Sequence, residues 1–118
     1  MLSKTYVRGP KGGTNLNLLV DTGSTYTVIE SEILRKIGCP PSTARDTRQI
    51  ITASGRVNVP RVQVAQIHCF GQRIENYHVF AHVFPREFYF DGLLGMDFLE
   101  GFPLEIKPYS GEIVVRNR

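Results

Sequence analysis

Short segments with the hydrophobic pattern of β-strands, separated by turn residues, make up most of this sequence. The clearest alternation spans residues 76–83, where Tyr, Val, Ala and Val occupy the odd positions and Asn, His, Phe and His the even ones. Alternation of this kind is typical of a strand with one buried face, so we predict a half-buried strand. Residues 49–52 and 57–59 flank Ala53-Ser54-Gly55-Arg56, and together they predict a hairpin.

Helical patterns are confined to two places. Apolar residues at positions 33, 34 and 37 predict a helix that Ser31 caps and that Gly38 and Pro40-Pro41 end. A second, shorter helix is expected from Gly95 to Leu99. Many short strands with one medium and one short helix predict an all-β fold, closed like a barrel. The length of 118 residues fits a single domain, residues 1–118, without repeats or linkers.

One acidic residue stands where a predicted strand meets a glycine turn. The largely apolar run of residues 16–20 leads directly into Asp21-Thr22-Gly23-Ser24. The two hydroxyls can hold the turn by hydrogen bonds, and the glycine permits a sharp bend and close approach of another backbone. The chain has three other aspartates, and none of them precedes Thr-Gly. Chemistry that needs two such loops therefore needs a second copy of the chain.

A second motif, Asp91-Gly92-Leu93-Leu94-Gly95, begins 70 positions after Asp21 and continues into a short apolar segment that ends at Leu99. The two motifs together resemble the single-domain, retropepsin-like aspartic proteases. In that family Asp-Thr-Gly-Ser/Ala is followed, much later, by two apolar residues and a glycine before a short helix. Residues 51–57 resemble the flap of bacterial and archaeal members, and the resemblance covers about residues 15–99.

The resemblance implies a retropepsin fold with one barrel-like lobe per chain, and a homodimer that hydrolyses peptide bonds in extended substrates. Asp21 would be the catalytic acid, one from each subunit, and Thr22 would bond across the dimer axis. Gly23 would lie beside the substrate backbone. Ser24 would donate a hydrogen bond to Asp21, which would favour the charged form of that acid.

Two further sets of residues receive roles from the same resemblance. The flap would comprise Thr52, Ala53, Ser54 and Gly55. The loop-supporting motif would comprise Leu93, Leu94 and Gly95, which thread past the catalytic loop and keep it dry. Residues 2–7 and 112–115 have strand-like composition, and we expect them to pair between subunits.

The implied reaction uses two carboxylates that share one proton. One takes a proton from a water molecule that attacks the scissile carbonyl, and the other donates a proton to the carbonyl oxygen. This chemistry needs no cofactor and no metal, so the expected partners are a second copy and peptide substrates. The alternative within the same fold is a catalytically silent module for dimerisation or peptide binding.

Two other enzyme classes are disfavoured by spacing and context. A metal hydrolase would need clustered ligands, but His78 and His82 on one strand would stand about 13 Å apart. A serine nucleophile at Ser24 would need an elbow between strand and helix and a histidine placed to activate it, and neither is evident. We therefore expect no metal site.

The sequence departs from viral members at the supporting ion pair. Viral enzymes often carry an acid just after the catalytic turn, paired with an arginine beside the downstream glycine. Here these places hold Thr25-Tyr26 and Met96-Asp97. The ion pair is therefore absent or rebuilt with Asp97 and an arginine elsewhere, and Asp97 is expected on a helix surface or in an ion pair.

Composition adds few constraints. The net charge is +3 and the basic residues are scattered, which is typical of a solvated surface rather than a nucleic-acid interface. No apolar run is long enough for a membrane span, and the first residues lack the apolar core of a signal peptide.

Cys39 and Cys69 lack the spacing of a metal or redox motif. We therefore expect free thiols in a reducing compartment, with a disulfide left open as the alternative. A cytoplasmic location is favoured.

Overall fold

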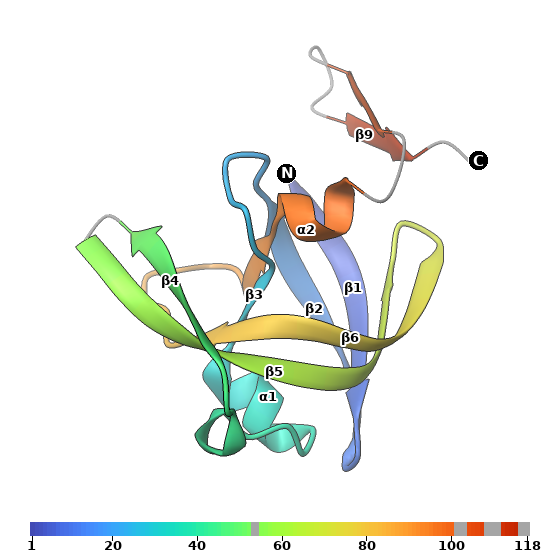
Figure 1. The fold of residues 1–118 in the computed structure, drawn as a ribbon. Helices are drawn as coiled ribbons and strands as arrows, with labels where there is room; N and C mark the ends of the chain where they lie inside the picture. The colour runs from blue at the N-terminus through green and yellow to red at the C-terminus, as the bar shows by residue number, and fades with distance from the viewer. Residues whose placement is uncertain (53–54, 101–103, 108–111, 116–118) are drawn as a thin grey trace.

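The structure, a computed structural model, describes residues 1–52, 55–100, 104–107 and 112–115 (Figure 1). Its strands are β1 (Leu2–Gly9), β2 (Gly12–Val20), β3 (Val28–Glu30), β4 (Thr47–Thr52), β5 (Gly55–Cys69), β6 (Gln72–His82), β7 (Gly92–Leu94), β8 (Leu104–Lys107) and β9 (Glu112–Val115). The helical elements are α1 (Ser31–Lys36), α2 (Met96–Leu99) and the 3-10 turn η1 (Pro41–Thr43). Among the described residues, neither α-helix has the length and apolar character needed to cross a bilayer.

Six strands close into a barrel in the order β1-β2-β7-β3-β6-β5, and β1 pairs with β5 to complete the ring. Strand β4 pairs with the first part of β5, residues 55–60. This hairpin projects from the barrel (Figure 1). Strands β8 and β9 form a separate two-stranded sheet. The terminal strands β1 and β9 thus have partners within the chain, and their pairing between subunits stays a prediction.

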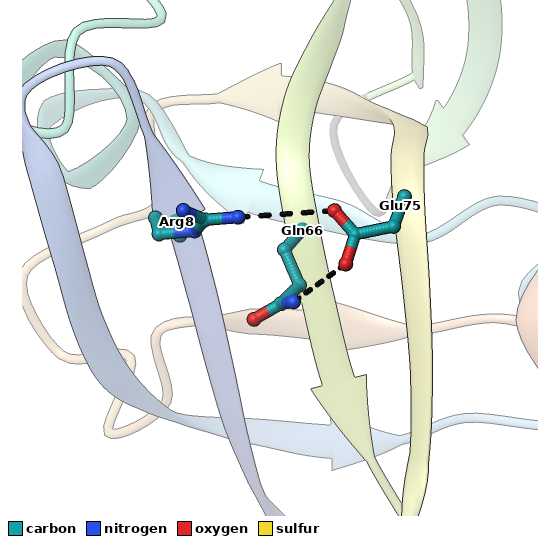
Figure 2. Close-up of polar contacts among 3 residues, drawn as sticks. All are labelled: Arg8, Gln66 and Glu75. Atoms are coloured by element: carbon teal, nitrogen blue, oxygen red, sulfur yellow. Dashed lines mark hydrogen bonds and ion pairs between the residues drawn. The ribbon is translucent and has the colours of Figure 1, made fainter.

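The barrel closes where β1 meets β5 over three register pairs, from Tyr6 to Arg8. Figure 2 shows the polar cluster on this seam, where Gln66 Nε2 donates to Glu75 at 2.7 Å and the Arg8 guanidinium lies 3.8 Å from the same carboxylate. The Arg8 and Glu75 side chains are about half exposed, so their ion pair contributes at most about 1 kcal/mol. Closure rests instead on the adjacent pair Val7 and Ile67, which are fully buried in the core.

Helix α1 differs from its prediction at the N-terminal end. Ser31 is its first residue and is buried, whereas Glu30 occupies the N-cap position without a capping side-chain bond. The prediction that Ser31 caps the helix is wrong, because strand β3 runs directly into the helix and the Glu30 carboxylate accepts the Phe84 N–H at 2.9 Å instead. The C-terminal end is as predicted: Gly38 has φ +89°, and two backbone hydrogen bonds complete a Schellman motif around it.

Strand β6 is buried on both faces near its end, so the prediction of a half-buried strand is wrong there. Val79 and Ala81 belong to the barrel core, whereas Phe80 faces the other way and is only 4% exposed. Phe80 packs with Val28 and Val59 in a second, smaller cluster. Three partly buried side chains cover this cluster, namely Tyr26, Ile50 and Phe84. The second cluster lies beneath the hollow described in the next section.

Cys39 and Cys69 are buried and free. Cys69 Sγ lies 2.9 Å from Ser3 Oγ and accepts a hydrogen bond from Thr5 Oγ1 at 3.3 Å. Burial raises the pKa of both thiols, and for Cys69 it outweighs the hydrogen bonds, which lower the pKa. Because the thiolate is the reactive form, both cysteines should react slowly with thiol reagents while the chain is folded.

Candidate active site

The loop that carries Asp21, called the catalytic loop after its predicted role, begins where β2 ends. Asp21 is half-buried, and Thr22 and Gly23 beside it are exposed. The Asp21 N–H donates to the carbonyl of Leu94 at 3.0 Å, and Asp21 Oδ1 accepts the N–H of Gly23 at 2.9 Å. The loop backbone therefore holds one carboxylate oxygen, and strand β7 fixes the position of the acid.

Strand β7 runs parallel to β2, with Val20 opposite Leu94, and the chain that follows β7 lies against the loop. Met96 donates its N–H to the carbonyl of Ser24 at 2.8 Å. A Cβ at Gly95 would lie 2.4 Å from the carbonyl oxygen of Tyr26, which is closer than real Cβ atoms approach other atoms. Glycine is therefore required there, and the structure brings residues 93–95 against the catalytic loop.

A hydrogen-bonded pair, formed by the buried Thr27 and the half-buried Asp97, supports the loop that carries Asp21. Asp97 Oδ1 accepts the hydroxyl of Thr27 at 2.7 Å, and Asp97 Oδ2 accepts the N–H of Thr27 at 3.0 Å. Asp97 Oδ1 also accepts the N–H of Phe98 at 2.8 Å, and the Thr27 hydroxyl accepts the N–H of Gly95 at 3.1 Å. The Thr27–Asp97 pair thus joins the chain after the catalytic loop to the start of α2.

The predicted role of Asp97, on a helix surface or in an ion pair, is wrong. In the described part of the chain no lysine or arginine pairs with Asp97, and its partners are backbone and hydroxyl donors. Thr27, which is fully buried, is absent from the residues predicted from sequence. The available signal was an acid immediately before the apolar pair Phe98-Leu99, in a helix too short to place it far from the core.

Tyr77 lies beside this pair, with its ring edge-on to Phe98 and 5.8 Å between ring centroids. Burial raises the pKa of Tyr77 well above its usual range, and the negative charge of Asp97 raises it further. The unfolded chain therefore loses this phenolic proton first. Tyr77 contributes its full stabilisation below about pH 10, and that contribution is lost as pH rises beyond this value.

We expect the free energy of unfolding, measured with denaturant from about pH 8 to pH 11, to fall more steeply for the wild type than for Tyr77→Phe. The control is Tyr89→Phe, because residue 89 is 91% exposed. That variant should keep the steep wild-type decline. Equal slopes for the wild type and Tyr77→Phe would show that Tyr77 does not titrate as its burial demands.

Asp21 lies on an open hollow of about 590 Å³, between the catalytic loop, strand β4 and the segment after β6. The hollow is lined by Asp21, Gly23, Ser24, Thr25, Tyr26, Val28, Gln49, Ile50, Ile51, His82, Phe84, Pro85, Phe88 and Leu93. Asp21 is the sole carboxylate in this described lining, which is otherwise mostly apolar. A hollow of this size and chemistry suits side chains of an extended peptide.

His78 and His82 do not lie together in the hollow beside Asp21. His82 lines the hollow beside Asp21, whereas His78 lines a separate hollow of about 550 Å³ that contains no residue of the catalytic loop. The described residues include no group of three or more His, Cys, Asp or Glu side chains placed to hold a metal ion. The separate hollow is lined by another acid, Asp46, so what distinguishes the hollow beside Asp21 is the Asp-Thr-Gly loop in its lining.

The sequence matches the family described as gag-polyprotein putative aspartyl protease over residues 7–101, a span that holds both the Asp21 loop and strand β7. The chain belongs to this aspartyl protease family. The structure is similar to a retropepsin-like aspartic protease from Rickettsia conorii, with a TM-score of 0.63 and 20% identity over 95% of this chain and 96% of that one. It is also similar to the EIAV protease, solved with an inhibitor, with a TM-score of 0.60 and 20% identity over 86% of each chain. No curated protein gives a significant match.

These similarities confirm the predicted fold class, an all-β retropepsin-like barrel with short helices. In this member of the aspartyl protease family, the described flap residues, Thr52 and Gly55, lie at the end of the β4–β5 hairpin. Thr52 pairs with Gly55, and Ala53 and Ser54 lie outside the described residues. The hollow is instead lined by Gln49 and Ile50 of β4, which were not predicted, and by Ile51, the first residue of the segment 51–57 that resembles a flap. Ile51 is 81% exposed although it lines the hollow.

Ser24 does not make the predicted bond to Asp21. Its hydroxyl donates to the carbonyl of Tyr26 at 2.9 Å, and a hydroxyl has one proton to donate. The prediction that Ser24 donates to the catalytic acid is therefore wrong, because the nearby carbonyl within the same turn takes the proton. Thr22 is exposed, and its bond across a dimer axis stays a prediction.

The corrected geometry changes what Ser24→Ala should do. We expect the acidic limb of the pH–rate profile to stay in place, while the free energy of unfolding falls by about 0.5–1.5 kcal/mol through loss of the bond to Tyr26. Profiles at two protein concentrations separate titration from dissociation, since only a dissociation limb moves with concentration. An acidic limb that shifts upward at both concentrations would contradict this expectation and show that Ser24 does donate a hydrogen bond to Asp21.

Proposed function

We propose that this protein is an aspartic endopeptidase that acts as a homodimer, with one Asp21 from each subunit. One observation carries the proposal: Asp21 is the sole carboxylate in the described lining of the hollow, and it lies on a loop whose neighbours Thr22 and Gly23 are exposed. Hydrolysis by this chemistry needs two carboxylates close enough to share a proton. A second copy, docked loop to loop, supplies the second acid.

In the proposed dimer, a water molecule lies between the two carboxylates. The ionised Asp21 takes a proton from this water as its oxygen attacks the scissile carbonyl carbon, and the protonated Asp21 of the partner subunit donates a proton to the carbonyl oxygen. The resulting tetrahedral intermediate collapses when the C–N bond breaks: the leaving nitrogen accepts the proton that the first Asp21 took from the water, and one hydroxyl of the intermediate returns a proton to the Asp21 of the partner subunit. The Gly23–Asp21 bond of 2.9 Å holds each acid in place throughout.

The substrate backbone would bind to two features of each subunit. Strand β4 pairs with β5 and with no other described strand, so its free edge can add an extended peptide by backbone hydrogen bonds. Gly23 is exposed and carries no side chain, so the peptide can approach the acids closely. Binding an extended backbone at both places would position one peptide bond over the carboxylate pair.

The test is cleavage of a mixed peptide library by the purified chain over a series of protein concentrations, with sedimentation of the same samples. Specific activity should rise in step with the dimer fraction and should not respond to a chelator. An active species that sediments as a monomer would refute the proposal, and loss of activity with the chelator would favour a metal hydrolase. A stable dimer that cleaves no peptide in the library would favour the silent binding module.

A further inference from the structure

The wall of the hollow that the end of β6 and the segment after it provide is built largely from aromatic rings. Four of the lining side chains carry rings, namely Tyr26, His82, Phe84 and Phe88. Phe84 and Phe88 stack with 4.6 Å between centroids and an angle of 11°, and His82 lies edge-on to Phe84 at 5.1 Å. On the catalytic-loop side, Tyr26 packs on the buried Phe80 at 4.7 Å. The hollow is therefore edged by rings on two sides.

The rings are held in place before any substrate binds. The backbone N–H of Phe84 donates to the Glu30 carboxylate at 2.9 Å, and the N–H of Phe88 donates to the carbonyl of Pro85 at 2.9 Å. Phe90 packs perpendicular to Phe88, with 5.0 Å between the ring centroids. A wall fixed in this way loses little conformational freedom on binding. The wall can therefore discriminate between substrate side chains by how favourably each one contacts its rings.

We infer that this wall, chiefly Phe84 and Phe88, makes the enzyme prefer an aromatic substrate side chain over an aliphatic one of equal size in this hollow. The inference rests on the proposed peptidase function. Ring faces are negative and ring edges positive, so an incoming ring gains edge-to-face or offset contacts that an alicyclic ring cannot make. Since the alicyclic side chain is at least as large and as apolar as the aromatic one, a preference for the aromatic one reports on the rings and not on general hydrophobicity.

The experiment compares two peptides that differ at one position next to the cleaved bond, with phenylalanine in one and cyclohexylalanine in the other. Cyclohexylalanine has the same number of carbon atoms as phenylalanine, but its ring is puckered and has no π-electrons. The ratio of kcat/KM should favour phenylalanine by about two- to tenfold at the position that this hollow serves. Each flanking position is scanned in turn to find that position. Equal rates for the two peptides at every position would overturn the inference.

Two variants of the same segment locate the effect. Phe88→Leu should bring the ratio close to one, while Tyr89→Leu should leave it unchanged, because Tyr89 is 91% exposed and does not line the hollow. A ratio that persists in a folded Phe88→Leu would assign the preference elsewhere and contradict the inference. The comparison on the wild type needs no variant, so it holds even if Phe88→Leu fails to fold. Absence of any cleavage counts against the peptidase proposal, whereas cleavage without aromatic preference counts against this inference alone.

Discussion

Asp21→Asn should remove peptidase activity while leaving the fold intact. Asparagine keeps the shape of the side chain, and its amide oxygen can still accept the N–H of Gly23 that Asp21 Oδ1 accepts at 2.9 Å. It cannot take a proton from water or hold the shared proton. Because both subunits of the proposed dimer lose their acid together, we expect kcat/KM to fall by about 10⁴-fold or more.

The measurement is cleavage of a peptide substrate by wild type and variant at equal dimer concentration, with circular dichroism and sedimentation to show that the variant folds and associates. Asp46→Asn serves as the matched control, because Asp46 is exposed and does not line the hollow beside Asp21. That control should keep wild-type activity. Full activity in a folded Asp21→Asn would end the assignment of Asp21 as the catalytic acid.

Asp97→Ala should cost more stability than the loss of any exposed acid of the chain. The substitution leaves the N–H and the hydroxyl of the fully buried Thr27 without their carboxylate acceptor, whereas the N–H of Phe98 keeps the carbonyl of Gly95 at 3.2 Å. Orphaned buried donors cost about 1–3 kcal/mol each, so we expect the free energy of unfolding to fall by about 3–5 kcal/mol. A small domain has about 5–15 kcal/mol in total, so this variant should be close to unfolding at physiological temperature.

Two variants calibrate this loss in denaturant unfolding. Asp97→Asn should be intermediate, because its amide oxygen can keep the bonds at Oδ1 while its NH₂ group faces the N–H of Thr27. Asp46→Ala, which removes a mostly exposed ion pair with Arg61 at 3.6 Å, should cost about 1 kcal/mol or less. If Asp97→Ala cost no more than Asp46→Ala, the Thr27–Asp97 pair would not support the loop.

Features encoded by neighbouring residues could be predicted from the sequence. The closed β architecture, the β4–β5 hairpin and the glycine end of α1 all follow from turn residues and local alternation. The acid at the end of β2 was visible because a strand pattern runs into Asp-Thr-Gly. The position of residues 93–95 beside this loop came from the family resemblance and not from the pattern itself.

Features that depend on partners far along the chain could not be predicted. The Thr27–Asp97 pair joins residues 70 positions apart, and nothing local to either residue names the other. The second buried face of β6 depends on Val59 of β5 and Val28 of β3, which meet Phe80 only once the barrel closes. The Ser24 hydroxyl had two acceptors within reach in sequence, and the loop geometry decided for Tyr26.

The aromatic wall illustrates the same limit. Residues 84–90 form no regular element in the structure, so neither helical nor strand periodicity marks them as part of a site. Their rings gather because the turn at Pro85 brings Phe88 back onto Phe84. Composition alone showed three phenylalanines in seven residues, a density that is unusual for an irregular segment of a small domain and that could have drawn attention to it.

The central claim, that one active site is built from the Asp21 of two chains, is tested most directly by mixing. Wild type is unfolded and refolded with an equal amount of Asp21→Asn, and in a parallel sample the wild type is refolded alone in the same amount. Random pairing leaves one quarter of the dimers fully wild type, so activity should fall to about one half of that of the wild type alone, and further as the variant is added in excess. Activity that stays at the wild-type level at every ratio, with mixed dimers shown to form, would mean that each chain carries a complete site of its own.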